Sequence, residues 1–231
     1  GYWKCPTCKY DYFGEAGVAL ARKAVDDFTQ RFGEKTTNTL EAKNRLACIL
    51  DDHGMFKQSH LLLESLVTDA TEQFGIDHVE TLRVKMNLAG ALNRQNKLTR
   101  ARMLYESVLA GWTLYLGPSH IDTLKAKENL AIVMRKQGDI LQARRLLSTI
   151  HDDLIIQLGA NHLETLHTQL NISGTMFAQG EYDEAITLHT STVQGLARQL
   201  GAHHTMVISA RLDLGSKLNK MGKTREALRV F

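Results

Sequence analysis

One spacing constrains this 231-residue chain more than any other feature: an apolar residue followed by glycine returns every 42 residues. A constant period of about 20 to 50 residues is the sequence signature of a repeat architecture, in which one small unit is stacked many times. A histidine, an asparagine and a Thr-Leu pair follow the same step, so the whole unit recurs. The glycine pairs are Phe32-Gly33, Phe74-Gly75, Leu116-Gly117, Leu158-Gly159 and Leu200-Gly201.

Each repeat is predicted to contain two helices. In the third repeat, apolar residues between Leu124 and Met134 recur at helical spacing, Gly138 interrupts them, and a second stripe runs from Ile140 to Leu158. We therefore expect an all-α chain of antiparallel helix pairs that is a piece of a longer protein. The expected divisions are a leader at 1–13, a partial repeat at 14–33, repeats at 34–75, 76–117, 118–159 and 160–201, and a truncated repeat at 202–231.

Both ends of the helices carry signals. Glycine, or Asn96 in its place, follows each first helix, and the glycine of the 42-residue pairs follows each second helix, as expected for residues with positive φ. Capping boxes are predicted where a capping side chain precedes an acid by three residues, and the outer repeats lack them. We expect those outer helix starts to be less well fixed. The predicted boxes are Asp77-x-x-Glu80, Ser119-x-x-Asp122 and Asn161-x-x-Glu164.

The internal order of a repeat resembles a known family. Asn129-Leu130-Ala131, then Gln137-Gly138, then Ala143 is similar to the tetratricopeptide repeat, and the 42-residue period with the linker Leu-Gly-x-x-His-x-x-Thr-Leu resembles the kinesin light chain type. The resemblance implies a right-handed α-solenoid whose first helices line a concave groove. It also implies that the asparagine before Leu-Ala points into this groove and binds the backbone of a peptide.

The residues that would bind a peptide follow from that resemblance and from helical spacing around the asparagine. An amide has both donors and an acceptor, so it can hold an extended backbone whatever its side chains are. The alternative is that the asparagine only joins neighbouring helices. Basic neighbours favour an acidic ligand in the middle repeats, whereas Glu41, Asp51 and Asp52 make the first repeat acidic. The candidate residues are Asn87, Asn129, Asn171, Arg83, Arg94, Lys125, Arg135 and Lys136.

Metal and enzyme sites have little support in the sequence. Cys5 and Cys8 have the spacing of half a zinc site or of a redox motif, but no second pair follows, so they are weak metal candidates. The recurring histidines lie one repeat apart, about 8–10 Å between helix axes, which is too far for one ion that needs nitrogens at about 2 Å. They are better explained as local caps at helix starts. We expect no cofactor and no enzymatic activity.

Composition narrows the function further. The formal net charge is only +3, and no long apolar run occurs, so neither nucleic acid nor a membrane is an expected partner. The three cysteines form no disulfide framework, which favours the cytoplasm. We expect a protein-interaction scaffold that binds an extended, acidic peptide segment. The alternatives are a sensor or autoinhibitory arm of a nucleotide-binding signalling protein, which packs against other domains of its parent, and a protein in which Cys5 and Cys8 complete an upstream zinc site.

Overall fold

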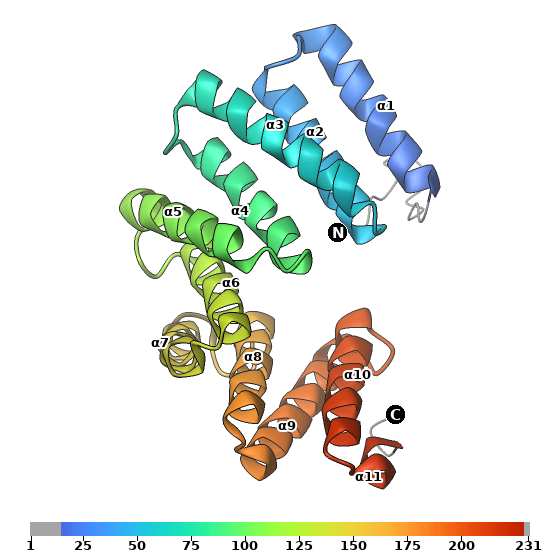
Figure 1. The fold of residues 1–231 in the computed structure, drawn as a ribbon, viewed down its shortest axis with the longest axis vertical. Coiled ribbons are helices and arrows are strands. Elements are labelled where there is room, and N and C mark those ends of the chain that lie inside the picture. The colour runs from blue at the N-terminus through green and yellow to red at the C-terminus, as the bar shows by residue number, and fades with distance from the viewer. Residues whose placement is uncertain (1–14, 229–231) are drawn as a thin grey trace. The chain divides into compact units, whose positions relative to one another are not determined.

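The structure is a computed structural model, and it describes residues 15–228. All regular structure in this range is helical (Figure 1). The described residues divide into two compact units, one ending at Ala126 and one beginning at Lys127, so that the division falls inside one helix. The helices are α1 (Glu15–Phe32), α2 (Thr37–Asp52), α3 (Phe56–Phe74), α4 (Val79–Arg94), α5 (Leu98–Leu116), α6 (Ile121–Gln137), α7 (Ile140–Leu158), α8 (Leu163–Gln179), α9 (Tyr182–Leu200), α10 (Thr205–Lys220) and α11 (Thr224–Leu228).

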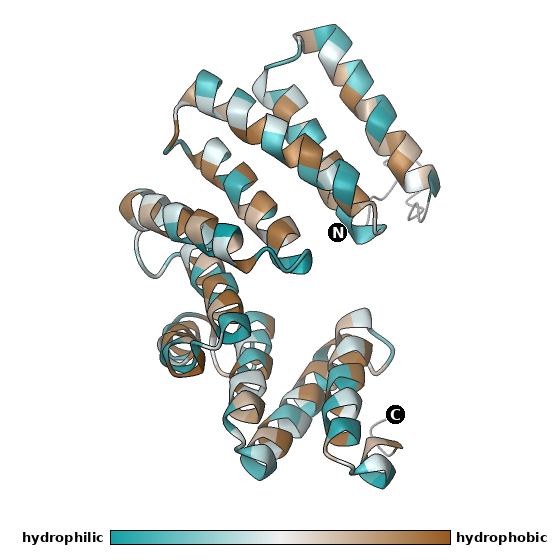
Figure 2. Ribbon diagram, in the orientation of Figure 1, coloured by the Kyte–Doolittle hydropathy of each residue, from teal (hydrophilic) through white to brown (hydrophobic). Residues whose placement is uncertain are grey.

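The first unit contains α1 to α5 and the first residues of α6. Consecutive helices run antiparallel and pack side by side, which Figure 1 shows for α1 to α4. Each helix has an apolar stripe, visible as alternating brown and teal along the ribbons of Figure 2, and the stripes meet between helices. Core clusters result. One is built on Val18, Ala21, Leu46 and Leu50, and another on Leu82, Val108, Trp112 and Ala126.

The second unit contains the rest of α6 and the helices α7 to α11. The same antiparallel packing joins α7 to α8, α8 to α9 and α9 to α10. One of its core clusters joins the second helix α9 to the first helices α8 and α10, and another joins α10 to α11. They are built on Leu166, Val193, Leu196, Val207 and Ala210, and on Leu214, Leu218 and Ala227. The all-α array of helix pairs predicted from the period is therefore confirmed.

The two kinds of helix end differ in backbone conformation. Gly180, after the first helix of its repeat, has φ 84° and ψ 7°, which is the left-handed region. Asparagine tolerates this region, and Asn96 adopts φ 59° at the equivalent position. Gly117, after a second helix, instead has φ 94° and ψ 160°, a region open only to glycine. This difference explains why asparagine replaces glycine after a first helix but after none of the second helices from Gly33 to Gly201.

The helix starts differ from the predicted capping boxes. The cap is the histidine one residue later, whose Nδ1 accepts a hydrogen bond from the backbone N–H two residues on. The distance is 3.2 Å at His78, His120, His162 and His204. The prediction that Asp77, Ser119 and Asn161 are the capping residues is thus wrong. The interpretation of the histidines as local caps is confirmed.

The expectation for the outer repeats is half right. The start of α10 is capped by His204 like its neighbours, so the prediction of a poorly fixed start is wrong there. The start of α2 has Thr36 at the capping position, and its side chain makes no capping hydrogen bond.

Small residues allow the two helices of a repeat to pack closely. Ala101, Ala143 and Ala185 are fully buried at equivalent positions of three second helices. Gly111 of α5 packs against Leu82 of α4 so closely that a Cβ at Gly111 would overlap the Leu82 side chain. The same contact returns 84 residues later, where a Cβ at Gly195 would lie 3.3 Å from a Leu166 methyl carbon. Alternate repeats therefore share this closest approach.

No helix within residues 15–228 combines the length and the apolar character needed to cross a bilayer.

Candidate functional site

Two of the asparagines predicted to bind a ligand backbone make contacts between first helices, which are the even-numbered helices α2 to α10. In the first unit, Asn87 Nδ2 of α4 donates to Asn44 Oδ1 of α2 at 2.9 Å. In the second unit, Asn171 Nδ2 of α8 donates to Glu128 Oε1 of α6, also at 2.9 Å. Such a bond uses one of the two N–H donors and leaves the amide able to make further bonds. The helix-joining role is therefore present, and the peptide-binding role stays a prediction.

In the first unit, the candidate arginines have anionic partners within the protein. Arg94 forms an ion pair with Asp51, whose side chain is only 1% exposed. Arg83 lies 3.2 Å from Glu80, one turn earlier on α4. The sequence suggested an acidic first repeat and basic middle repeats. Because Asp51 and Arg94 come from adjacent first helices, these opposite charges pair and partly neutralise one another.

The remaining candidates on α6 differ in exposure. Lys125 and Asn129 are half-buried, and Lys136 is exposed. Arg135 is half-buried and lines a pocket of the second unit together with a second candidate, Asn171.

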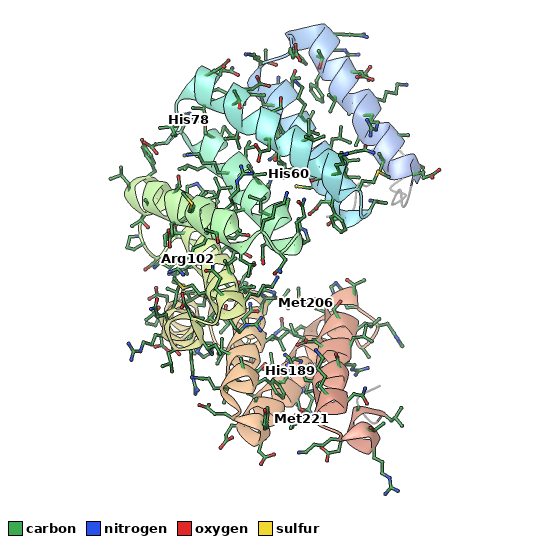
Figure 3. All side chains as sticks on the ribbon, in the orientation of Figure 1. His60, His78, Arg102, His189, Met206 and Met221 are labelled. Atoms are coloured by element: carbon green, nitrogen blue, oxygen red, sulfur yellow. The ribbon has the colours of Figure 1, made fainter. Side chains whose placement is uncertain are left out.

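The pocket encloses about 260 Å³ and is lined by first helices. α6 contributes Arg135, α8 contributes Asn171 and Gly174, and α10 contributes Asp213 and Lys217. Part of its wall comes from His189 of the second helix α9 and from Met206 at the start of α10, both labelled in Figure 3. We call this the cationic pocket.

Two cations of the cationic pocket converge on one glycine. A Cβ built on Gly174 would lie 3.7 Å from Arg135 Cζ and 3.8 Å from Lys217 Nζ, so both charges lie over the bare backbone of α8. Burial lowers the pKa of Arg135, while the Asp213 carboxylate acts in the opposite direction. Lys217 Nζ also lies 4.8 Å from the centre of the Phe177 ring, a cation–π contact that holds the ammonium over α8. The arrangement suits an oxyanion placed between the two cations.

A buried carboxylate, hydrogen-bonded to the pocket residues Asn171 and His167, joins α6 to α8. Glu128 accepts hydrogen bonds from Asn171 Nδ2, from Thr168 Oγ1 at 2.9 Å and from His167 Nδ1 at 3.2 Å. Burial alone would raise the pKa of Glu128, but the hydrogen bonds and the charge of His167 together outweigh burial and lower it. The carboxylate is thus held in its ionised form, which is what a buried acid with three donors requires.

Sequence reasoning missed His189. It is 1% exposed, its Nε2–H donates to the Ala210 carbonyl at 2.9 Å, and Ser173 Oγ lies 3.0 Å from its Nδ1. Burial, the largest cause, lowers the pKa of His189, and the bond to the Ala210 carbonyl partly opposes this. One signal was available, because the positions 42, 84 and 126 residues earlier hold Leu147, Tyr105 and Leu63. A histidine in an apolar stripe of a repeat marks a polar contact inside the core.

A ladder of lysines was also missed. Lys43 and Lys85 occupy equivalent positions of α2 and α4, and each Nζ donates to the carbonyl nine residues earlier. Lys85 is 5% exposed and reaches the Ile76 carbonyl at 3.0 Å, and Lys43 reaches the Glu34 carbonyl at 3.5 Å. These lysines tie the linker to the helix that follows it, so their recurrence at the 42-residue step reflects the fold and not a basic binding surface.

The weak metal candidates Cys5 and Cys8 lie outside the described residues. Within residues 15–228, no group of three or more histidine, cysteine or acidic side chains is placed to hold a metal ion.

Stacks of antiparallel helix pairs, with a pocket lined by their first helices, define an α-helical repeat protein of the interaction-scaffold class. The profile of the tetratricopeptide repeat family matches residues 80–152, 126–195 and 164–231, which together are more than half of the chain. The chain belongs to the tetratricopeptide repeat family. A comparison with curated proteins finds no match.

Solved structures with the same fold come from several proteins. A kinesin light chain-like protein of Podosopora anserina with nearly identical TPR-like repeats is 23% identical, covers 83% of this chain and 90% of its own, and has a TM-score of 0.64. BtubC (BKLC) from P. vanneervenii is 16% identical over 92% of this chain and 86% of its own, with a TM-score of 0.69. A Rap protein in complex with Competence and Sporulation Factor is 12% identical over 93% of this chain and 67% of its own, with a TM-score of 0.69.

Proposed function

We propose that this protein is an interaction scaffold that holds an extended, acidic segment of a partner along its first helices. The observation that carries this proposal is the cationic pocket, where Arg135 and Lys217 converge over Gly174 beside the amide of Asn171. The Rap structure supports it by analogy, since that protein of similar fold is solved in complex with Competence and Sporulation Factor.

The chemistry divides between two kinds of contact. The asparagine amides supply hydrogen bonds to a backbone, which do not depend on the partner's side chains. Arg135 supplies a planar fork of donors that matches a carboxylate, and glycine at position 174 lets the ligand come close to α8. Backbone contacts alone would give affinity without selectivity, so the acidic preference depends on the pocket cations.

The test measures binding of fluorescent acidic peptides by anisotropy at increasing salt. Arg135→Glu should weaken binding at least tenfold, because it replaces attraction by repulsion in a partly buried site, and salt should weaken binding to the unaltered protein. Arg198→Glu, an equal charge change at an exposed position of α9, serves as the control. If a variant with alanine at Asn87, Asn129 and Asn171 binds as well as the unaltered protein and Arg135→Glu has no effect, the proposal is wrong.

A further inference from the structure

The position that holds asparagine in three successive repeats holds an acid in the next repeat. The positions equivalent to Asn87, Asn129 and Asn171 continue to Asp213 on α10, one 42-residue step later. This aspartate lines the cationic pocket, so the residue type changes from a neutral amide to a carboxylate at the point where two cations meet.

Asp213 is paired with the pocket cations. Its Oδ2 lies 2.5 Å from Lys217 Nζ, one turn along α10, and its charge also acts on Arg135. The three side chains together carry a net charge of +1, where the two cations alone would carry +2. A carboxylate of the protein thus already occupies part of the place that an acidic ligand would take.

The three side chains differ in freedom. The Asp213 side chain is 53% exposed, whereas the Lys217 side chain is only 21% exposed and is held over the Phe177 ring. The aspartate can therefore turn into solvent while the lysine keeps its place. An exposed i,i+4 ion pair contributes little to stability, so breaking it for a ligand has a small cost.

We propose that Asp213 is a built-in competitor for the acidic group of the ligand, and that the pocket binds this group by displacing Asp213 from Lys217. This inference rests on the proposed function. Exchange of one carboxylate for another gains little, so a peptide with an isolated acid is disfavoured. Two neighbouring acidic residues can bind Arg135 and Lys217 together, so the pocket selects segments in which acids are adjacent.

The experiment compares three peptides of equal length with no acid, one acid or two adjacent acids. They are titrated into the unaltered protein, Asp213→Asn and Asp183→Asn. Asparagine is isosteric with aspartate and is the residue of the three preceding repeats, so Asp213→Asn should fold normally, which a thermal melt checks. Asp183 is 91% exposed on α9 and pairs only loosely with Lys223 at 3.6 Å, so its variant controls for the change in net charge.

Asp213→Asn should tighten binding of the one-acid peptide by about tenfold, the effect of one charge-assisted contact that no longer meets competition. The preference for adjacent acids should shrink, and the peptide without acid should be unaffected. Adding Lys217→Gln should abolish the gain, because both changes act on one contact.

Equal affinities of Asp213→Asn and the unaltered protein for every acidic peptide would overturn the inference, while loss of binding in Arg135→Glu would leave the proposed function standing. Failure of acidic peptides to bind any of the proteins would overturn both.

Discussion

Asn171 and Glu128 are joined by a hydrogen bond of 2.9 Å between two first helices, α8 and α6. The same carboxylate accepts bonds from Thr168 and His167, so one buried acid collects three donors from the neighbouring repeat. A buried carboxylate with full hydrogen bonding stabilises the junction, whereas one that loses its donors would destabilise it. The polar contact that was predicted to serve a ligand also holds the walls of the pocket in place.

Glu128→Gln should lower the free energy of unfolding by about 1–3 kcal/mol, because the amide loses charge-assisted hydrogen bonds and brings an N–H against existing donors. Urea denaturation measures this. Glu106→Gln, which alters an exposed pair with Arg102 on α5, is the matched control and should change the value by less than about 0.5 kcal/mol.

The same acid predicts a pH dependence. The pKa of Glu128 is lower in the folded protein than its ordinary 4.5, so its contribution to stability is present above that value and is lost as the pH falls through the folded pKa. Denaturation curves between neutral and acid pH should therefore show a fall that Glu128→Gln makes shallower. Parallel curves for the two proteins would contradict this.

His189 predicts a second loss of stability on acidification, which begins at a higher pH than the loss due to Glu128. Its pKa is lowered from the ordinary 6.5, so the unfolded chain binds a proton more readily than the folded one, and stability falls as the pH drops below 6.5. His189→Leu, which restores the residue type of Leu147 and Leu63, should remove this part of the dependence. The measurement is the difference in unfolding free energy between pH 7.5 and pH 5.5 for both proteins, with the unaltered protein losing more.

The close packing of α5 against α4 predicts that alanine substitutions at Gly111 and Gly90 have opposite effects on stability. Gly111→Ala should destabilise by about 1–3 kcal/mol, because its Cβ would overlap the Leu82 side chain. Gly90→Ala on the partner helix α4 places its Cβ 3.6 Å from Tyr105 Oη, an ordinary contact, and should be neutral or stabilising by up to about 1 kcal/mol. Thermal melts of the two variants check the packing, and equal melting temperatures would show that the approach is looser than described.

The histidine caps predict an effect that depends on the acceptor. His162→Ala should cost about 1 kcal/mol, because the Glu164 N–H loses its partner. His162→Asn should recover most of the loss, since asparagine is a good cap. Chemical denaturation distinguishes the two, and the same cost for both substitutions would mean that the histidine acts by packing.

The fold followed from the sequence because the repeat makes each local signal appear several times. The 42-residue step located the helix pairs, and the glycines located the helix ends. The helix starts were placed one residue too early, because aspartate and serine are stronger caps by residue type than histidine. Only the three-dimensional structure shows that His78 Nδ1 faces the Glu80 N–H.

The candidate site was less predictable. Arg135 and Asn171 were identified by helical spacing, but their partners depend on how neighbouring helices align side chains far apart in the sequence. The pairing of Arg94 with Asp51 and the meeting of Arg135 with Lys217 over Gly174 join residues 39 or more positions apart. Periodicity within one helix says nothing about such pairs.

The contacts from Asn87 to Asn44 and from Asn171 to Glu128 lie 84 residues apart, and the acceptor position between them holds Met86. The same kind of polar contact thus recurs after two repeats, and removal of two repeats would keep an amide opposite a polar acceptor. Excision of 76–159 would leave the amide of Asn171 facing Asn44. Excision of 118–159 alone would instead place the Met86 thioether opposite that amide.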